Sequence, residues 1–237
     1  MTRPSQENAW ENEYKNKKLV TGSQEPQTSF KDFLRWLRRD QGIELENLKV
    51  LDLGCGNGKN SNYLANLDEN NNIIAIDISD TALNDARIQA SKMGVYKQIK
   101  YYKRSIGRQF EIGDCELDLI LDITSSNSLS ESERKIYLEE CSRTLKSGGY
   151  LFVRALCKDG DKNAQNLLKL CPGNEHDTCV LPNVNIKERV FSKDDFINTY
   201  SPFFEMVELE KETHYTKLEG RLYKRNFWIA YLRKTKL

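Results

Sequence analysis

The sequence predicts an α/β fold, in which helices alternate with the strands of a mostly parallel sheet. Three observations support this prediction. Short apolar segments recur along the chain, and segments with the periodicity of amphipathic helices separate them. The first apolar segment, residues 49–53, runs directly into three alternate glycines and a helix. The second, residues 73–76, ends at Asp77, which places an acidic side chain at the carboxyl end of a predicted strand.

The first half of the chain is expected to contain an amphipathic helix followed by four strands. Apolar residues at helical spacing predict the helix over residues 29–40, and Gly42 follows its end. The predicted strands are residues 49–53, 73–76, 99–103 and 117–121, and the helices after the first two strands are residues 60–67 and 81–93.

The second half repeats the alternation and then ends in a hairpin. The expected elements are a helix over residues 131–145, a strand over 150–153, a short helix over 163–170, a helix from Ser192, and long strands over 204–215 and 223–233. The last two strands are joined around Glu219 and Gly220, so they are expected to pair with each other.

Composition and charge narrow the functional classes. The chain has 237 residues, enough for one α/β domain and an appendage. Its formal net charge of +1 does not indicate binding to nucleic acid or to an anionic membrane. No apolar run approaches the roughly 20 residues of a membrane helix, and residues 1–14 lack the apolar core of a signal peptide. We expect a soluble, cytoplasmic protein, whose oligomeric state the sequence leaves open.

The cysteines are expected to be reduced thiols, because no signal peptide directs the chain to an oxidising compartment. Cys157, Cys171, His176 and Cys179 offer the donors of a Cys3His zinc site. Their spacing does not match the compact C-x2-C arrangement of such sites, so the prediction is that no metal is bound.

The glycine segment indicates a nucleotide-type pocket. Gly54, Gly56 and Gly58 allow a sharp turn and let a ligand approach the main chain closely. A dinucleotide-binding loop has its third glycine three positions after the second, where this chain has Lys59. Asp52, in the preceding strand, would repel a pyrophosphate but suits a ligand with an ammonium group. A zwitterionic methionine tail carries such a group.

Residues 50–58, Val-Leu-Asp-Leu-Gly-Cys-Gly-Asn-Gly, resemble motif I of the class I S-adenosylmethionine-dependent methyltransferases. Residues 145–151, Leu-Lys-Ser-Gly-Gly-Tyr-Leu, resemble the family's motif before the fifth strand. The resemblance covers roughly residue 30 to the C-terminus. It implies a Rossmann-like, doubly wound, seven-stranded sheet with an antiparallel C-terminal hairpin strand, and S-adenosyl-L-methionine as the cofactor.

The resemblance also implies the cofactor contacts. Asp77, with Ile78 beside it, would accept hydrogen bonds from both ribose hydroxyls. Many relatives carry an Asp after the third strand for the adenine amino group, whereas this chain has Ser105 and Ile106 there. The expected cofactor-binding residues are Asp52, Gly54, Cys55, Gly56, Gly58, Asn60, Asp77, Ile78, Ser105, Ile106 and Asp122.

Two residues are candidates for a general base, which is needed only if the nucleophile is protonated at the working pH. Asp122 lies at the tip of the fourth strand, which borders the transferable methyl group in the family. His214 would reach the same edge by the family's topology. A satisfied histidine at the sheet edge is the alternative interpretation of His214.

Two segments are expected to enclose the substrate. Residues 1–27 resemble the N-terminal lid of small-molecule methyltransferases, with a surface helix as the alternative interpretation. A single methyltransferase domain would span residues 28–237, with a capping insertion at about 157–190. The expected substrate-contacting residues are Trp10, Tyr14, Asn127, Arg154 and Tyr215. For Arg154, a salt bridge to Asp159 or Asp161 is the alternative.

The leading functional prediction is methyl transfer to a nitrogen, oxygen or sulfur atom of a small molecule. A first alternative is an RNA or protein substrate, bound by Arg35, Arg38, Arg39 and the basic residues of segment 221–225. A second is an adaptor that binds S-adenosylmethionine without catalysis, and a third is a dinucleotide-dependent oxidoreductase.

Overall fold

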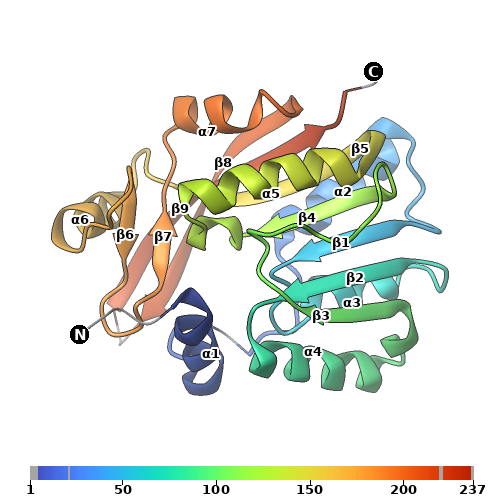
Figure 1. The fold of residues 1–237 in the computed structure, drawn as a ribbon, viewed down its shortest axis with the longest axis horizontal. Coiled ribbons are helices and arrows are strands. Elements are labelled where there is room, and N and C mark those ends of the chain that lie inside the picture. The colour runs from blue at the N-terminus through green and yellow to red at the C-terminus, as the bar shows by residue number, and fades with distance from the viewer. Residues whose placement is uncertain (1–4, 21, 219–220, 236–237) are drawn as a thin grey trace.

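The computed structural model describes residues 5–20, 22–218 and 221–235, and among these seven strands form one sheet (Figure 1). The strand order is β3 (Ile99–Lys103), β2 (Asn72–Asp77), β1 (Lys49–Leu53), β4 (Leu117–Ile123), β5 (Leu145–Cys157), β9 (Arg221–Arg233) and β8 (Glu205–Leu218). Strand β9 runs antiparallel to both of its neighbours, β5 and β8, and the other pairs in this sheet are parallel. The predicted fold class is therefore confirmed, whereas the turn expected at 219–220 lies outside the described residues.

Helices cover both faces of the sheet, and each face has its own apolar core. Alternate strand residues point to opposite faces, so Val50 joins one core and Leu51 the other. The first core contains α2 (Thr28–Gln41), α3 (Lys59–Ala65) and α4 (Asp80–Met93). The second contains α5 (Glu131–Thr144) and α7 (Lys193–Tyr200), and Figure 1 shows α5 in front of the sheet with α2 behind it.

The fifth strand is longer than the sequence suggested. The sequence predicted a helix over residues 131–145 and a strand over 150–153, with Gly148 and Gly149 between them. In the structure α5 ends at Thr144, and β5 begins at the next residue. Gly148 keeps a left-handed φ of +80°, and the pairing of β5 with β4 shifts register near its start. The irregularity lies within the strand, because residues on both sides of it still pair with β4.

The expected insertion contains α6 (Lys162–Leu170) and a small hairpin of β6 (Thr178–Val180) and β7 (Lys187–Arg189), which we call the cap. The sequence predicted only the helix. Beyond β7 the chain bonds to β5, since the Phe191 amide donates to the Leu156 carbonyl at 2.9 Å. The cap therefore extends past the carboxyl end of β4, on the ligand-binding side of a parallel sheet.

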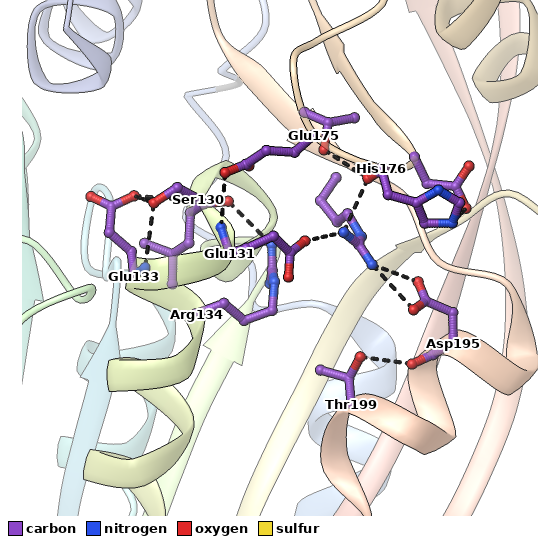
Figure 2. A network of polar contacts seen from close by, with 12 residues as sticks. Ser130, Glu131, Glu133, Arg134, Glu175, His176, Asp195 and Thr199 are labelled. Atoms are coloured by element: carbon purple, nitrogen blue, oxygen red, sulfur yellow. Dashed lines mark hydrogen bonds and ion pairs between the residues drawn. The ribbon is translucent and has the colours of Figure 1, made fainter.

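One buried arginine fixes the cap to the rest of the fold. Arg189, with a side chain only 6% exposed, pairs with Glu131 at the start of α5 and with Asp195 on α7 (Figure 2). Its guanidinium also donates to the His176 carbonyl at 3.0 Å. The Glu175 carboxylate accepts from the Glu131 amide at 3.1 Å. The cap therefore donates to α5 through Arg189 and accepts from α5 through Glu175. A buried bidentate pair of this kind holds its partners in one geometry.

No helix in the described ranges has both the length and the apolarity required to cross a bilayer.

Candidate active site

A cavity of about 370 Å3 lies at the carboxyl ends of β1, β2 and β4. The glycine loop forms its floor, and the loop after β4 forms one wall. Helix α1 (Gln6–Asn16) and cap residue Glu188 close it from above. Three segments that are distant in sequence thus meet near the boundary between β1 and β4, where the strand order of the sheet changes direction. Open α/β sheets bind their ligands at such a point.

The glycine loop needs its glycines for two separate reasons. Gly54, Gly56 and Gly58 have φ values of +69°, +57° and +79°, which other residues adopt only with strain. Space is also lacking, because a Cβ on Gly54 would lie 2.3 Å from the Ser125 hydroxyl oxygen. A Cβ on Gly58 would lie 2.9 Å from the Ala86 Cβ. The loop therefore packs tightly between α4 and the loop after β4.

Asp77 holds the glycine loop in place from the end of β2. One carboxylate oxygen accepts from the Gly56 amide at 2.9 Å, and the other accepts from the Ser79 amide at 2.8 Å. Burial raises the pKa of Asp77 to about 6, although these amide bonds oppose the shift. Asp77 also lines the cavity, so a hydroxyl-bearing ligand would meet a buried carboxylate there.

Asp52 and Asp122, expected to contact ligand, face the helices instead. Neither lines the cavity. Asp52 accepts a 2.6 Å bond from the Ser61 hydroxyl on α3. Asp122 accepts from the Ser125 and Ser126 amides at 3.1 Å each and from the Tyr137 hydroxyl at 2.8 Å. Both side chains point away from the cavity because of their place in the strand. Each is the penultimate residue of its strand, so its side chain points onto a face of the sheet under a helix.

Helix α1 covers the cavity and forms hydrogen bonds to the loop after β4, to the start of α4 and to the cap. Trp10 donates from its indole nitrogen to the Ser128 hydroxyl at 3.1 Å. Glu11 accepts from the hydroxyls of Ser79 and Thr81 at 2.7 Å each. Figure 1 shows α1 between the β6–β7 hairpin and α4, consistent with these contacts. These hydrogen bonds hold α1 against the loop after β4 and the start of α4.

The contact between α1 and the cap is both polar and apolar. Gln6 donates to the Asn185 carbonyl at 3.1 Å and accepts from the Lys187 amide at 2.9 Å. Ala9 is buried in a small apolar cluster with Cys179, Leu181 and Ile186 of the cap. Burial of this cluster contributes to the docking of α1, because apolar area leaves water on both surfaces.

Both aromatic residues of α1 line the cavity, as expected. Tyr14 extends over the glycine loop, where burial and the nearby Asp77 raise the pKa of its phenol well above the ordinary value. The Trp10 and Tyr14 ring centroids are 6.3 Å apart. Together the rings give the upper part of the cavity an apolar, planar surface.

A sequence model of the methyltransferase domain family matches residues 44–215, which is more than two thirds of the chain and includes the glycine loop, β4 and the cap. The chain belongs to the class I S-adenosylmethionine-dependent methyltransferases. S-adenosylmethionine is the cofactor of this family.

The methyltransferase has curated relatives at low identity. It is 29% identical over 111 residues to a ubiquinone biosynthesis O-methyltransferase of Chelativorans, covering 47% of this chain and 41% of the relative. It is 25% identical over 182 residues to the Shewanella pealeana protein of the same name, covering 69% and 72%. The first alignment thus spans about two fifths of that relative's length.

A solved structure shares the fold over nearly the whole methyltransferase. It is the 1,6-didemethyltoxoflavin-N1-methyltransferase of Burkholderia thailandensis, with bound 1,6-didemethyltoxoflavin and S-adenosylhomocysteine. The TM-score is 0.69 at 14% identity, over 97% of this chain and 87% of that one. At this identity the likeness concerns the fold alone.

S-adenosylmethionine fits the cavity of this methyltransferase by the chemistry of its walls. The glycine loop exposes main chain without Cβ atoms, and Asp77 offers a carboxylate at the end of β2. The Asn60 side-chain oxygen is buried and has no hydrogen-bond partner among the residues that the structure describes, so the cavity contains an acceptor that a ligand would satisfy. The expected cofactor residues that line the cavity are Gly54, Cys55, Gly56, Asn60, Asp77, Ile78, Ser105 and Ile106.

Several expected substrate or catalytic residues lie elsewhere in the methyltransferase. Asn127 is buried beneath the loop and accepts from the Leu156 amide at 3.3 Å. Arg154 stacks on Phe227 and pairs with Glu212 at 3.1 Å, so its salt bridge goes to neither aspartate considered above. His214 and Tyr215 are exposed on the edge strand β8. None of these four expected residues lines the cavity, because β8 is separated from β4 by two strands and Arg154 points to the α2 side.

The sequence missed other residues that line the cavity, among them Gln27, Lys59 and Glu188. Lys59 directly follows the glycine motif, at the position where a dinucleotide-binding loop has its third glycine. This difference was the signal in the sequence that could have identified Lys59. Gln27 precedes the predicted first helix by two residues, and nothing in its surroundings marks it. Glu188 pairs with Arg225 at 2.9 Å, a contact between residues far apart in the chain.

The four residues considered for zinc are dispersed over the cap and β5. Cys157 donates weakly to the Asp159 carbonyl, and His176 is exposed beside Asp177. Within the described ranges, no group of three or more His, Cys, Asp or Glu side chains is arranged to hold a metal ion.

Proposed function

We propose that this methyltransferase transfers the methyl group of S-adenosylmethionine to an oxygen, nitrogen or sulfur atom of a small, planar molecule bound beneath α1. The observation that carries the proposal is that α1 covers the cavity. The Trp10–Ser128 hydrogen bond joins α1 to the loop after β4, and Glu188 of the cap lines the same space. A cavity of about 370 Å3 covered in this way suits a cofactor and a small acceptor rather than a polymer.

The aromatic side chains support a planar acceptor. Trp10 and Tyr14 present ring faces and edges, which favour offset or edge-to-face contacts with a second ring. The curated relatives are named O-methyltransferases of ubiquinone biosynthesis, and the fold neighbour is named for methylation of a nitrogen in 1,6-didemethyltoxoflavin. Both the relatives and the neighbour are consistent with small cyclic substrates.

The cofactor supplies an electrophilic methyl group on a sulfonium. The protein's contribution is orientation and exclusion of water, since alignment of the reacting groups accounts for much of the rate in such displacements. Tyr14, Ile123 and Leu129 supply part of the cavity wall, and Glu188 offers a carboxylate whose position Arg225 fixes. Neither histidine of the chain lines the cavity. These features favour an acceptor that loses its proton readily, such as a phenol, a thiol or a ring nitrogen.

We also propose that residues 1–27 act as a lid over a single domain that spans 28–237. Helix α1 is joined to α2 by residues 17–27, and its hydrogen bonds reach α4, the loop after β4 and the cap. Glu11 tightens this docking. Burial alone would raise its pKa, but hydrogen bonds from Ser79 and Thr81 outweigh burial and lower the pKa to about 2. A substrate would enter when these contacts open.

The arrangement of basic residues argues against RNA. Gln27, next to the start of α2, lines the cavity, whereas Arg38 and Arg39 lie in the last turn of that helix. The helix has 14 residues and is therefore about 20 Å long, so these arginines are far from the reacting methyl group. Arg35 and Arg39 also pair with neighbouring aspartates, which reduces their net charge toward a phosphate.

The test is a transfer assay that measures S-adenosylhomocysteine released with small phenols, catechols, thiols and heteroaromatic amines, and with tRNA and peptides. We expect turnover with members of the small-molecule set and none with the polymers. Turnover of tRNA or peptide alone would reverse the assignment. Binding of S-adenosylhomocysteine without turnover of any class would identify an adaptor.

A further inference from the structure

Glu188 of the cap presents a carboxylate to the cavity. It lies in the middle of β7, and its side chain is only 17% exposed. The Oε2 atom accepts a 2.9 Å hydrogen bond from Arg225, whereas the Oε1 atom accepts none from the part of the chain that the structure describes. A carboxylate that is fixed through one oxygen can bind a hydrogen-bond donor of a ligand with the other.

The two cations next to Glu188 in the sequence do not pair with it. Lys187 and Arg189 point to the other face of β7, because side chains alternate along a strand, and they form ion pairs with other acidic residues there. Glu188 shares its face of the hairpin with Cys179, the opposite residue of β6, which is buried in the apolar cluster that includes Ala9 of α1. The Glu188 carboxylate is therefore on the α1 side of the hairpin.

Arg225 does not cancel the negative charge of Glu188, because it lies between two carboxylates. Its Nε atom is 3.9 Å from the Asp161 carboxylate, which is 1% exposed. Burial would lower the pKa of Arg225, but Glu188 and Asp161 outweigh burial and raise it. One guanidinium thus balances two carboxylates, and the group retains one negative charge in excess. Glu188 is the member of this group that lines the cavity, so the excess charge is presented there.

The cations that line the cavity do not neutralise Glu188 either. Within the described ranges these cations are Arg104 and Lys59. Arg104 forms an ion pair with Glu111, and Lys59 begins α3 at the glycine loop rather than at the cap. The part of the cavity beside the cap is therefore acidic, and it is complementary to a positively charged group of a ligand.

A second carboxylate and two aromatic rings would meet the same cation. Glu133 lines the cavity, and its Oε2 atom accepts from the Ser130 hydroxyl at 2.6 Å (Figure 2). Burial would raise the pKa of Glu133, but the Ser130 hydrogen bonds and two nearby cations lower it, so this carboxylate is ionised and partly balanced. Trp10 and Tyr14 also line the cavity, and the faces of aromatic rings attract cations.

We propose that Glu188 binds a protonated amino group of the methyl acceptor, so that the enzyme prefers planar acceptors with an amine side chain to neutral or carboxylated ones. The protonated amine has no lone pair, so it is the group that is held, while an atom of the ring receives the methyl group. The inference rests on the proposed methyl transfer to a small planar molecule and adds the charge of that molecule.

The test compares methyl acceptors in matched sets of three. Each set shares one ring, a catechol, a thiophenol or an imidazole, which carries an aminoethyl, a propyl or a carboxymethyl group. Release of S-adenosylhomocysteine measures kcat/KM. With wild-type protein, the aminoethyl member should exceed the propyl member by about 10- to 100-fold, and the carboxymethyl member should be the poorest. The difference should lie in KM, because the contact holds the ground state and the transition state alike.

Three variants test the role of the charge. Glu188→Gln removes the charge, but its amide oxygen can still accept from Arg225. It should lower kcat/KM for the aminoethyl member by about 10- to 100-fold and leave the propyl member within about twofold. Glu188→Asp keeps the charge and should keep the aminoethyl member as the preferred one. Glu175→Gln is the matched control, because Glu175 is a cap carboxylate that pairs with Lys187 at 3.7 Å but does not line the cavity. It should leave all preferences unchanged.

Binding of S-adenosylhomocysteine at wild-type affinity verifies that each variant is folded. Equal kcat/KM for the three members in wild-type protein would overturn this inference and leave the proposed function standing. An unchanged preference in Glu188→Gln, or an equal loss of preference in both Glu188 variants, would show that the charge of Glu188 is not the cause. Absence of turnover on every ring, with S-adenosylhomocysteine bound, would reject the proposed function and this inference together.

Discussion

The hydroxyl of Tyr14 lies against the main chain of Gly56, so that a Cβ atom on Gly56 would stand 2.6 Å from the hydroxyl oxygen. The residues are 42 positions apart, and the contact links the roof of the cavity directly to its floor. The absence of a side chain at Gly56 therefore serves the docking of α1 as well as the approach of a ligand.

Gly56→Ala should undock α1. The new methyl group would displace Tyr14, and the φ of +57° would add about 1 kcal/mol of backbone strain. Hydrogen exchange of residues 6–16 should rise. Gly94→Ala is the matched control, because Gly94 has a φ of +76° but nothing within 4 Å of a Cβ. It should lose similar stability without faster exchange in α1. Equal exchange in the two variants would contradict the contact.

Asp52→Asn should stabilise the protein at neutral pH. Burial raises the pKa of Asp52 from 3.8 to about 6, opposed by the bond from Ser61. Between these values the folded state retains a proton that the unfolded state has released. The contribution to stability therefore falls as pH rises from about 4 to about 6, by up to about 3 kcal/mol. Asp77 acts in the same direction.

The check is urea unfolding at pH 4.5 and pH 7.5. The variant should exceed wild type by about 1 kcal/mol at the lower pH and by about 3 kcal/mol at the higher pH. Asp194→Asn, a neutralisation at an exposed position in the first turn of α7, should not reproduce this difference. A variant with the same pH slope as wild type would show that Asp52 carries no such penalty.

Arg189→Met should destabilise the cap by about 1–3 kcal/mol, because it removes a buried guanidinium that hydrogen-bonds Asp195 and the His176 carbonyl. Asp195 would lose two hydrogen bonds of 2.9 and 3.1 Å, and Glu131 would lose its ion pair. Urea unfolding and exchange of residues 178–190 measure the effect. Arg233→Met removes an exposed pair with Glu205 and should cost less than about 1 kcal/mol. Similar costs for both variants would show that the Arg189 contacts contribute little.

Asp122→Asn should retain most of the activity. A general base contributes about 100- to 10,000-fold to rate, and the amide would remove it entirely. If Asp122 only positions the loop, the Asn oxygen still accepts from the Ser125 and Ser126 amides. We expect kcat within about fivefold of wild type and an unchanged pH profile. A loss of about 100-fold would restore Asp122 as a base.

His214→Ala should likewise leave kcat/KM within about twofold, because His214 is exposed on β8 and does not line the cavity. Steady-state kinetics with the best small-molecule acceptor provides the measurement. Thr199→Ala on α7 is a comparable change outside the cavity. A selective loss of kcat in the His214 variant would place the histidine in the mechanism.

The fold and the glycine loop under the cavity could be predicted from the sequence alone. The strands, the helices and the glycine loop are contiguous segments, so spacing and periodicity contain the information that forms them. Gly54, Gly56 and Asp77 could be assigned in this way. Asp77 is the last residue of β2, where the end of the strand itself places the side chain beside the loop.

The other groups that line the cavity could be identified only from the folded arrangement of the elements. Asp52 and Asp122 sit one residue before the ends of their strands, and this difference turns them under helices to bond Ser61 and Tyr137. The partners of Trp10 and Glu188 lie on elements distant in the chain. Such contacts depend on how the helices, the cap and the sheet pack together, and local sequence patterns do not encode that packing.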